Sequence, residues 1–148
     1  MSWRRRIEPL VKPLFFFWAR LTRPMTLGVR GVVTDKEGRV LLVEHTYVHG
    51  WYLPGGGVDR GESVEQALRR ELLEEAGVEI EGAPELIAIH ASETFKNDHV
   101  ALYRIRAWRQ VEATSRGEIA RTGFFAPDAL PEGTTRANRR RIAEALGR

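Results

Sequence analysis

One helix with both ends marked in the sequence constrains this chain more than any other feature. The stretch Ser63–Gln66 has the form of a capping box, in which each of the two outer side chains satisfies a backbone N–H of the first turn. Gly77 is a fitting stop, because glycine adopts a left-handed backbone at little cost. An apolar stripe at four-residue spacing consists of Val64, Leu68 and Leu72. We therefore expect a helix over residues 63–76 that buries one side in a core.

Three glutamates share one side of this expected helix. At about 100° per residue, Glu75 lies about 40° from Glu71, and Glu74 lies about 60° away on the other side. Like charges at this spacing repel, so something should offset the cost. The chain has no cysteine, and carboxylate oxygens favour Mg²⁺ or Mn²⁺, which also bind phosphates. We expect a divalent cation on this face; an acidic face that is simply solvated is the alternative.

The residues around the helix resemble a known family motif. The chain reads Gly56, five residues, Glu62, seven residues, Arg70-Glu-Leu, one residue, Glu74-Glu75, one residue, Gly77-Val78. This pattern resembles the Nudix box of the Nudix (MutT-like) hydrolases at every specified position. The segments 51–57 and 123–132 are also similar to those that precede the box and close the family domain, so the resemblance covers about residues 26–146.

The resemblance implies a fold and a reaction. It implies an α/β protein, a Nudix-type α/β/α sandwich with a mixed central sheet, over residues 25–148, preceded by a separate N-terminal segment, residues 1–24. The implied enzyme hydrolyses a pyrophosphate bond in a nucleoside diphosphate linked to another moiety, or in a nucleoside triphosphate, by attack of an activated water on phosphorus. Two alternatives remain open: a nucleotide-sensing module on the same scaffold, and a lipid-linked diphosphate hydrolase at a membrane surface.

The resemblance also implies roles for individual residues. The expected ligands of Mg²⁺, with Mn²⁺ as the other candidate, are Glu71, Glu74, Glu75 and the backbone carbonyl of Gly55. Arg70 is expected to orient one of these carboxylates. Glu62 is expected to pair with Arg70 and brace the turn into the helix, although this position touches metal in some members. The proton of the attacking water is expected to pass to Glu71 or to Glu118, with Glu93 as a further possibility.

Substrate contacts are less specified by the sequence. Aromatic and cationic side chains can stack on a base or bind phosphates. The candidate substrate-binding residues are Arg30, His45, Tyr47, Trp51 and Phe95. Most of the aromatic residues are nevertheless expected to pack in the core. The proline typical of ADP-ribose-cleaving relatives is missing, since Ser92 and Glu93 stand in its place. The tyrosine of dinucleoside-polyphosphate cleavers is not evident either.

Alternating apolar runs and turn residues predict the remaining elements. Strands are expected over residues 27–34, 39–44, 85–90, 100–108 and 124–126, with loops over 45–52 and 115–123. A last helix is expected over residues 135–146. The irregular order of strands and helices favours a mixed sheet with helices on its faces over a regular doubly wound sheet.

The N-terminal segment is the basic part of the chain. Residues 1–30 contain seven Lys and Arg against one Glu, so this segment sets the pI of about 9.7 and the remainder is mildly acidic. The high pI therefore does not indicate a nucleic acid partner, and none is expected; the resemblance implies a small-molecule diphosphate substrate instead. Lys12 and Pro13 interrupt the apolar run, which argues against a signal peptide or a membrane span. For residues 3–20 we expect packing on the domain or in a homodimer, or contact with a membrane surface. The expected location is cytoplasmic, with a peripheral membrane location as the alternative.

Overall fold

The structure is a computed structural model that describes residues 17–18, 21–22, 24–115 and 117–148. The predictions for residues 3–20, which are packing, a homodimer interface or a membrane contact, therefore fall almost wholly outside the described residues. Within that segment, the side chains of Phe17 and Trp18 are exposed, at 63% and 51%. No helix in the described ranges combines the length and the apolar character needed to cross a membrane.

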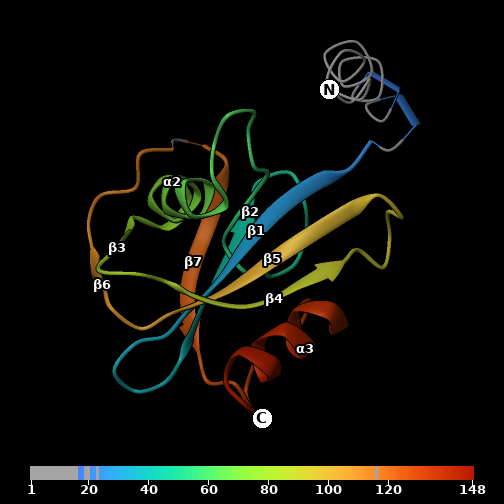
Figure 1. Cartoon of the computed structure of the whole chain (residues 1–148). Coiled ribbons are helices and arrows are strands. Elements are labelled where there is room, and N and C mark those ends of the chain that lie inside the picture. The colour runs from blue at the N-terminus through green and yellow to red at the C-terminus, as the bar shows by residue number, and fades with distance from the viewer. Residues whose placement is uncertain (1–16, 19–20, 23, 116) are drawn as a thin grey trace, which may run out of the picture.

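The described chain has the predicted mixed α/β fold (Figure 1). In chain order its elements are β1 (Thr26–Val33), β2 (Val40–His45), α2 (Val64–Ala76), β3 (Val78–Ile80), β4 (Glu85–Ala91), β5 (Asp98–Ile105), β6 (Trp108–Gln110), β7 (Ile119–Phe125) and α3 (Arg136–Ala145). β1 and β5 are parallel, and β4 is antiparallel to β5. The pairs β2–β7 and β3–β6 are antiparallel. Both strand directions occur, as expected for a mixed sheet.

Helices α2 and α3 pack on opposite faces of the strands, as Figure 1 shows. Successive side chains of a strand point to opposite faces, and β1 follows this rule. Val29 and Val33 pack in the same cluster as Leu72 of α2, whereas Val32 packs in the cluster that contains Ile142 of α3. All five side chains are at most 1% exposed. The central strands are therefore buried on both faces, and α2 is fixed against one of them.

Helix α2 has the ends that the sequence predicts. Ser63 is the N-cap, and its side chain and that of Gln66 complete the capping box. Gly77 is the C-cap, with a left-handed backbone at φ 61°. Leu68 and Leu72 are fully buried, so the acidic face of the helix lies at the edge of the core.

Three elements differ from expectation. The strand predicted over residues 100–108 is two strands, because the chain breaks at the exposed pair Arg106 and Ala107 and Trp108 then pairs with Ile80. β7 begins at Ile119, inside the predicted loop; its exposed polar residues pair with β2 through backbone groups, which need no apolar pattern. The three-residue β3 was not predicted.

Candidate active site

The loop before α2 lies directly against β1. The backbone N–H of Val29 donates to the carbonyl oxygen of Gly56 at 2.8 Å. Gly55 has a φ of 147°, and a Cβ at this residue would collide with the backbone of Val29. A Cβ on Gly56 would collide with the carboxylate of Glu71. The two glycines therefore let the loop pass between a strand and an acidic side chain.

Glu75 is the most buried acidic side chain of α2, at 8% exposure. Its Oε2 accepts the backbone N–H of Gly55 at 2.9 Å. Its Oε1 lies 3.0 Å from Nε2 of His45, the last residue of β2. A carboxylate oxygen accepts hydrogen bonds, so Nε2 of His45 carries the hydrogen in this pair. The loop and the strand thus hold the Glu75 carboxylate from two sides.

Glu71 lies one turn earlier on the same side of α2. Burial raises the pKa of its carboxyl group, the ion pair with Arg70 opposes this rise, and the negative charges of Glu75 and Glu74 add to it. Nη1 of Arg70 donates to Oε1 of Glu71 at 2.8 Å. The acidic side chains are therefore close enough to repel one another in a poorly hydrated place, which a cation would relieve.

Arg70 connects the helix to the loop before it. Its Nε and Nη2 donate to the two carboxylate oxygens of Glu62 at 2.8 and 3.0 Å, and Nη2 also donates to the carbonyl of Gly57 at 3.0 Å. These bonds from Arg70, and a further one from the backbone N–H of Asp59, lower the pKa of Glu62 to about 2. Glu62 thus forms a two-point ion pair with Arg70.

Glu74 lies farther from these groups. Its Oε2 is 3.4 Å from Nη1 of Arg70, and its side chain is 39% exposed. Among the residues that the structure describes, no three carboxylate or imidazole groups converge as a ready-made metal site. These carboxylates do not converge because Glu71 is hydrogen-bonded to Arg70, whereas Glu75 is hydrogen-bonded to Gly55 and His45.

A cavity of 380 Å³ is lined by Glu71 and Glu75 of α2 but not by Glu74. It brings together residues from β1, the end of β2, the loop between β2 and α2, α2 itself and the loop that precedes β7. The predicted site residues that line it are Arg30, His45, Tyr47, Gly55, Glu71, Glu75 and Glu118. Glu118 is exposed, and the backbone N–H of Thr46 donates to its carbonyl at 2.9 Å. Glu71, Glu75 and the more distant Glu118 thus line one cavity.

Other predicted residues lie elsewhere. Trp51 packs on Phe125, with ring centroids 4.8 Å apart, on the side of the core that contains α3. Phe95 is 68% exposed, in the turn between β4 and β5, and does not line the cavity. Glu93 forms an ion pair with Arg140 of α3.

Sequence reasoning missed two features of the site. Val48 lines the cavity from the loop after β2, and nothing in the sequence separates this valine from a core residue. His45 was predicted to contact substrate, and the structure adds its hydrogen bond to Glu75. The two residues are 30 positions apart, so only the packing of β2 beside α2 reveals the pair.

Comparison with known proteins identifies the family of this chain. The sequence pattern of the NUDIX domain matches residues 24–146. A MutT-like protein of Streptomyces ambofaciens is 29% identical over 121 residues, which are 82% of this chain and 77% of that protein. An RNA pyrophosphohydrolase of Shewanella piezotolerans is 41% identical over 61 residues, and this match covers 41% of the chain but only 33% of that protein.

Solved structures agree with this result. A MutT NUDIX hydrolase from Burkholderia pseudomallei superposes with a TM-score of 0.70 at 27% identity, over 82% of this chain and 98% of that one. An ADP-ribose pyrophosphatase from Streptococcus suis also gives a TM-score of 0.70, at 25% identity, over 84% and 91% of the two chains. The chain therefore belongs to the NUDIX domain family and is a Nudix hydrolase, an enzyme that acts on phosphorus-containing anhydrides.

Proposed function

We propose that this Nudix hydrolase requires Mg²⁺, with Mn²⁺ as a substitute, and cleaves the pyrophosphate bond of a nucleoside diphosphate derivative or a nucleoside triphosphate. One observation carries the proposal: the carboxylates of Glu71 and Glu75 are held at one cavity beside the loop at Gly55. Two acids in such a place are costly unless a cation joins them.

The donor atoms suit a hard cation. Glu71, Glu74, Glu75 and the carbonyl of Gly55 would hold it, and all four offer oxygen. The carbonyl oxygen of Gly55 accepts no hydrogen bond from the described part of the chain. Each carboxylate oxygen of Glu75 accepts one hydrogen bond and keeps a second lone pair. Glu71 keeps one carboxylate oxygen, Oε2, outside its hydrogen bond with Arg70.

The chemistry follows from these positions. A bound divalent cation would neutralise the phosphate oxygens and make a bound water more acidic. Arg70 orients Glu71 through its hydrogen bond and keeps Glu62 as its own counter-charge. Glu118 takes the proton of the attacking water, because it lines the cavity and forms no ion pair with a described residue. Glu71, by contrast, is engaged by Arg70.

The substrate contacts come from the rim of the cavity. Arg30 supplies a positive charge for phosphate oxygens. Tyr47 is 71% exposed, with its ring centroid 5.2 Å from that of His45, and so offers a face on which a base can stack. The Streptococcus suis neighbour is named an ADP-ribose pyrophosphatase, which supports a small nucleotide as the substrate here.

A hydrolysis screen tests this proposal. Nucleoside di- and triphosphates, sugar nucleotides, dinucleotides and lipid diphosphates are incubated with Mg²⁺ or Mn²⁺, and the released products are measured. Wild type and Glu65→Gln, an exposed acid on the same helix, should cleave at least one nucleotide. Glu75→Gln should cleave it at least about 100-fold more slowly. Equal rates for Glu75→Gln and wild type would contradict the mechanism.

A further inference from the structure

Large apolar side chains are exposed at the end of the sheet where β1 begins, β4 ends and β5 begins (Figure 1). The backbone N–H of Thr26 donates to the carbonyl oxygen of Asn97 at 3.0 Å, so the start of β1 lies beside the turn between β4 and β5. Met25 directly precedes β1, and Phe95 lies in that turn. Both side chains point largely into solvent, at 65% and 68% exposure.

The described residues before Met25 extend this apolar surface. Residues 17–18 and 21–22 are helical, and Oγ1 of Thr22 donates to the carbonyl oxygen of Trp18, four residues earlier, at 2.8 Å. At about 100° per residue, Phe17, Trp18 and Leu21 fall within an arc of about 100°, and each is more than half exposed. We call Phe17, Trp18, Leu21, Met25 and Phe95 the apolar end. An exposed apolar surface of this kind is typical of a contact surface.

Positive charge accompanies the apolar end. Lys96 directly follows Phe95, is exposed and forms no ion pair with any described residue. In the sequence, residues 1–30 contain seven Lys and Arg against one Glu, and Arg20 and Arg23 stand on either side of Leu21. Cations and apolar residues are therefore mixed in this part of the chain.

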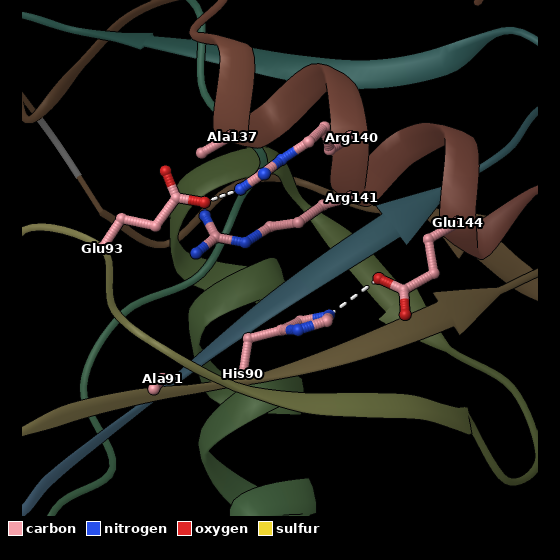
Figure 2. Close-up of a pocket in the computed structure, with 7 residues that line it drawn as sticks. All are labelled: His90, Ala91, Glu93, Ala137, Arg140, Arg141 and Glu144. Atoms are coloured by element: carbon pink, nitrogen blue, oxygen red, sulfur yellow. Dashed lines mark hydrogen bonds and ion pairs between the residues drawn. The ribbon is translucent and has the colours of Figure 1, made fainter.

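A cavity of 350 Å³ provides a further cation beside the end of β4 (Figure 2). The cavity lies between β4 and α3, and its two acids have partners, since Glu93 pairs with Arg140 and Glu144 pairs with His90. Figure 2 shows the side chain of Arg141 reaching from α3 into the space between these two pairs. Among the described residues Arg141 makes a single hydrogen bond, which is long at 3.5 Å. Its remaining N–H groups can therefore donate to phosphate oxygens.

We propose that the apolar end, together with Lys96 and Arg141, attaches the protein to a membrane surface that contains anionic phospholipids. The exposed aromatic and aliphatic side chains enter the boundary between head groups and acyl chains, where tryptophan is especially favoured. The Lys and Arg side chains meet the lipid phosphates. A second copy of the chain fits this end poorly, because the cations of two copies would repel one another, whereas an anionic surface supplies the opposite charge.

Co-sedimentation with vesicles tests this attachment on the full chain. Vesicles of phosphatidylcholine alone are compared with vesicles that also contain phosphatidylserine. Wild type should bind the mixed vesicles at least about tenfold more tightly than the neutral ones, and salt at about 0.5 M should weaken this binding. Phe95→Ser/Lys96→Gln should bind the mixed vesicles at least about fivefold more weakly than wild type. The matched control Leu86→Ser/Lys36→Gln changes an exposed apolar residue and an exposed lysine at the opposite end of the sheet, and should bind as wild type does.

Two further variants test the other groups. Phe17→Ser/Trp18→Ser/Leu21→Ser should bind the mixed vesicles at least about tenfold more weakly than wild type, because three apolar side chains no longer enter the lipid. Arg141→Gln should weaken binding to the mixed vesicles by about threefold and leave binding to neutral vesicles unchanged. Its control is Arg106→Gln, at an exposed arginine after β5, which should match wild type.

Several results would overturn the attachment. One is equal binding of wild type to both kinds of vesicle, or binding to neither. Another is unchanged binding by Phe95→Ser/Lys96→Gln that circular dichroism shows to be folded. If this double variant does not fold, Lys96→Gln decides by comparison with Lys36→Gln, and equal affinities of the two would contradict the proposal. Light scattering detects the other occupant, since a wild type that dimerises and leaves both kinds of vesicle unbound would assign the apolar end to a second copy of the chain.

Discussion

Nε2 of His45 lies 3.0 Å from Oε1 of Glu75, so the last residue of β2 holds an acidic side chain of α2. Both side chains are nearly buried, at 11% and 8% exposure. The other oxygen of Glu75 accepts the N–H of Gly55. A strand, a helix and a loop therefore meet at one carboxylate, which we propose as a metal ligand.

Replacing His45 by alanine should destabilise the fold. The change leaves one oxygen of a buried carboxylate without its partner, which costs about 1–3 kcal/mol. Urea unfolding at pH 7 measures the difference. His49→Ala, at an exposed histidine in the following loop, serves as the control and should stay within about 0.5 kcal/mol of wild type. An equal loss of unfolding free energy in both variants would mean that the hydrogen bond between His45 and Glu75 does not stabilise the fold.

Two adjacent glycines provide a sharp comparison for activity. An added Cβ on Gly56 would collide with the Glu71 carboxylate, whereas one on Gly57 would meet nothing within 4 Å. Gly56→Ala should therefore displace Glu71 and lower kcat/KM at least about tenfold, as for other small misplacements of catalytic groups. Gly57→Ala should remain within about twofold of wild type. Similar rates for the two variants would argue against a fixed position for Glu71.

Glu62 should make stability depend on pH in acid. Its pKa is lowered from 4.5 to about 2 by Arg70 and by the N–H of Asp59. A group with a lowered pKa stabilises the fold above its unfolded pKa, and this contribution is lost as the pH falls from about 4.5 toward about 2. In urea titrations between pH 7 and pH 2.5, Glu62→Gln should be less stable than wild type at neutral pH and approach it in acid. Glu81→Gln, at an exposed glutamate after β3, should show no such convergence.

The role of Glu118 can be separated from binding. If its carboxylate accepts the proton of the attacking water, Glu118→Gln should lower kcat by about 10²–10⁴-fold and change KM little. An exposed acid outside the cavity, Glu112, gives the matched control Glu112→Gln. A normal kcat in Glu118→Gln would contradict this role and would favour Glu71 as the acceptor of the proton.

The sequence predicted α2 well because the signals for this helix are local. Ser63 and Gly77 mark its ends, and a four-residue repeat marks its buried side. The position of Glu71 and Glu75 at the edge of the core follows from these signals alone. Strand β7 lacked such a signal, because Arg121 and Thr122 pair with β2 through their backbones while their side chains remain exposed.

Contacts between segments far apart in the chain could not be predicted from local sequence patterns. In the last helix, nothing in the spacing of the basic residues distinguishes Arg141 from Arg140. In the structure, Arg140 pairs with Glu93, whereas Arg141 makes one long hydrogen bond, of 3.5 Å, to Asn138 within the described part of the chain. These relations depend on how α3 sits on the sheet, which local patterns do not encode.

The central claim is that the acidic face of α2 binds a divalent cation, and Mn²⁺ binding measures this directly. Electron paramagnetic resonance of free Mn²⁺ is recorded during titration into wild type, the double variant Glu71→Gln/Glu75→Gln and the control Glu65→Gln, each confirmed as folded by circular dichroism. Wild type and the control should bind Mn²⁺, and the double variant should bind it at least about tenfold more weakly. Equal Mn²⁺ affinity in the double variant and wild type would contradict the account.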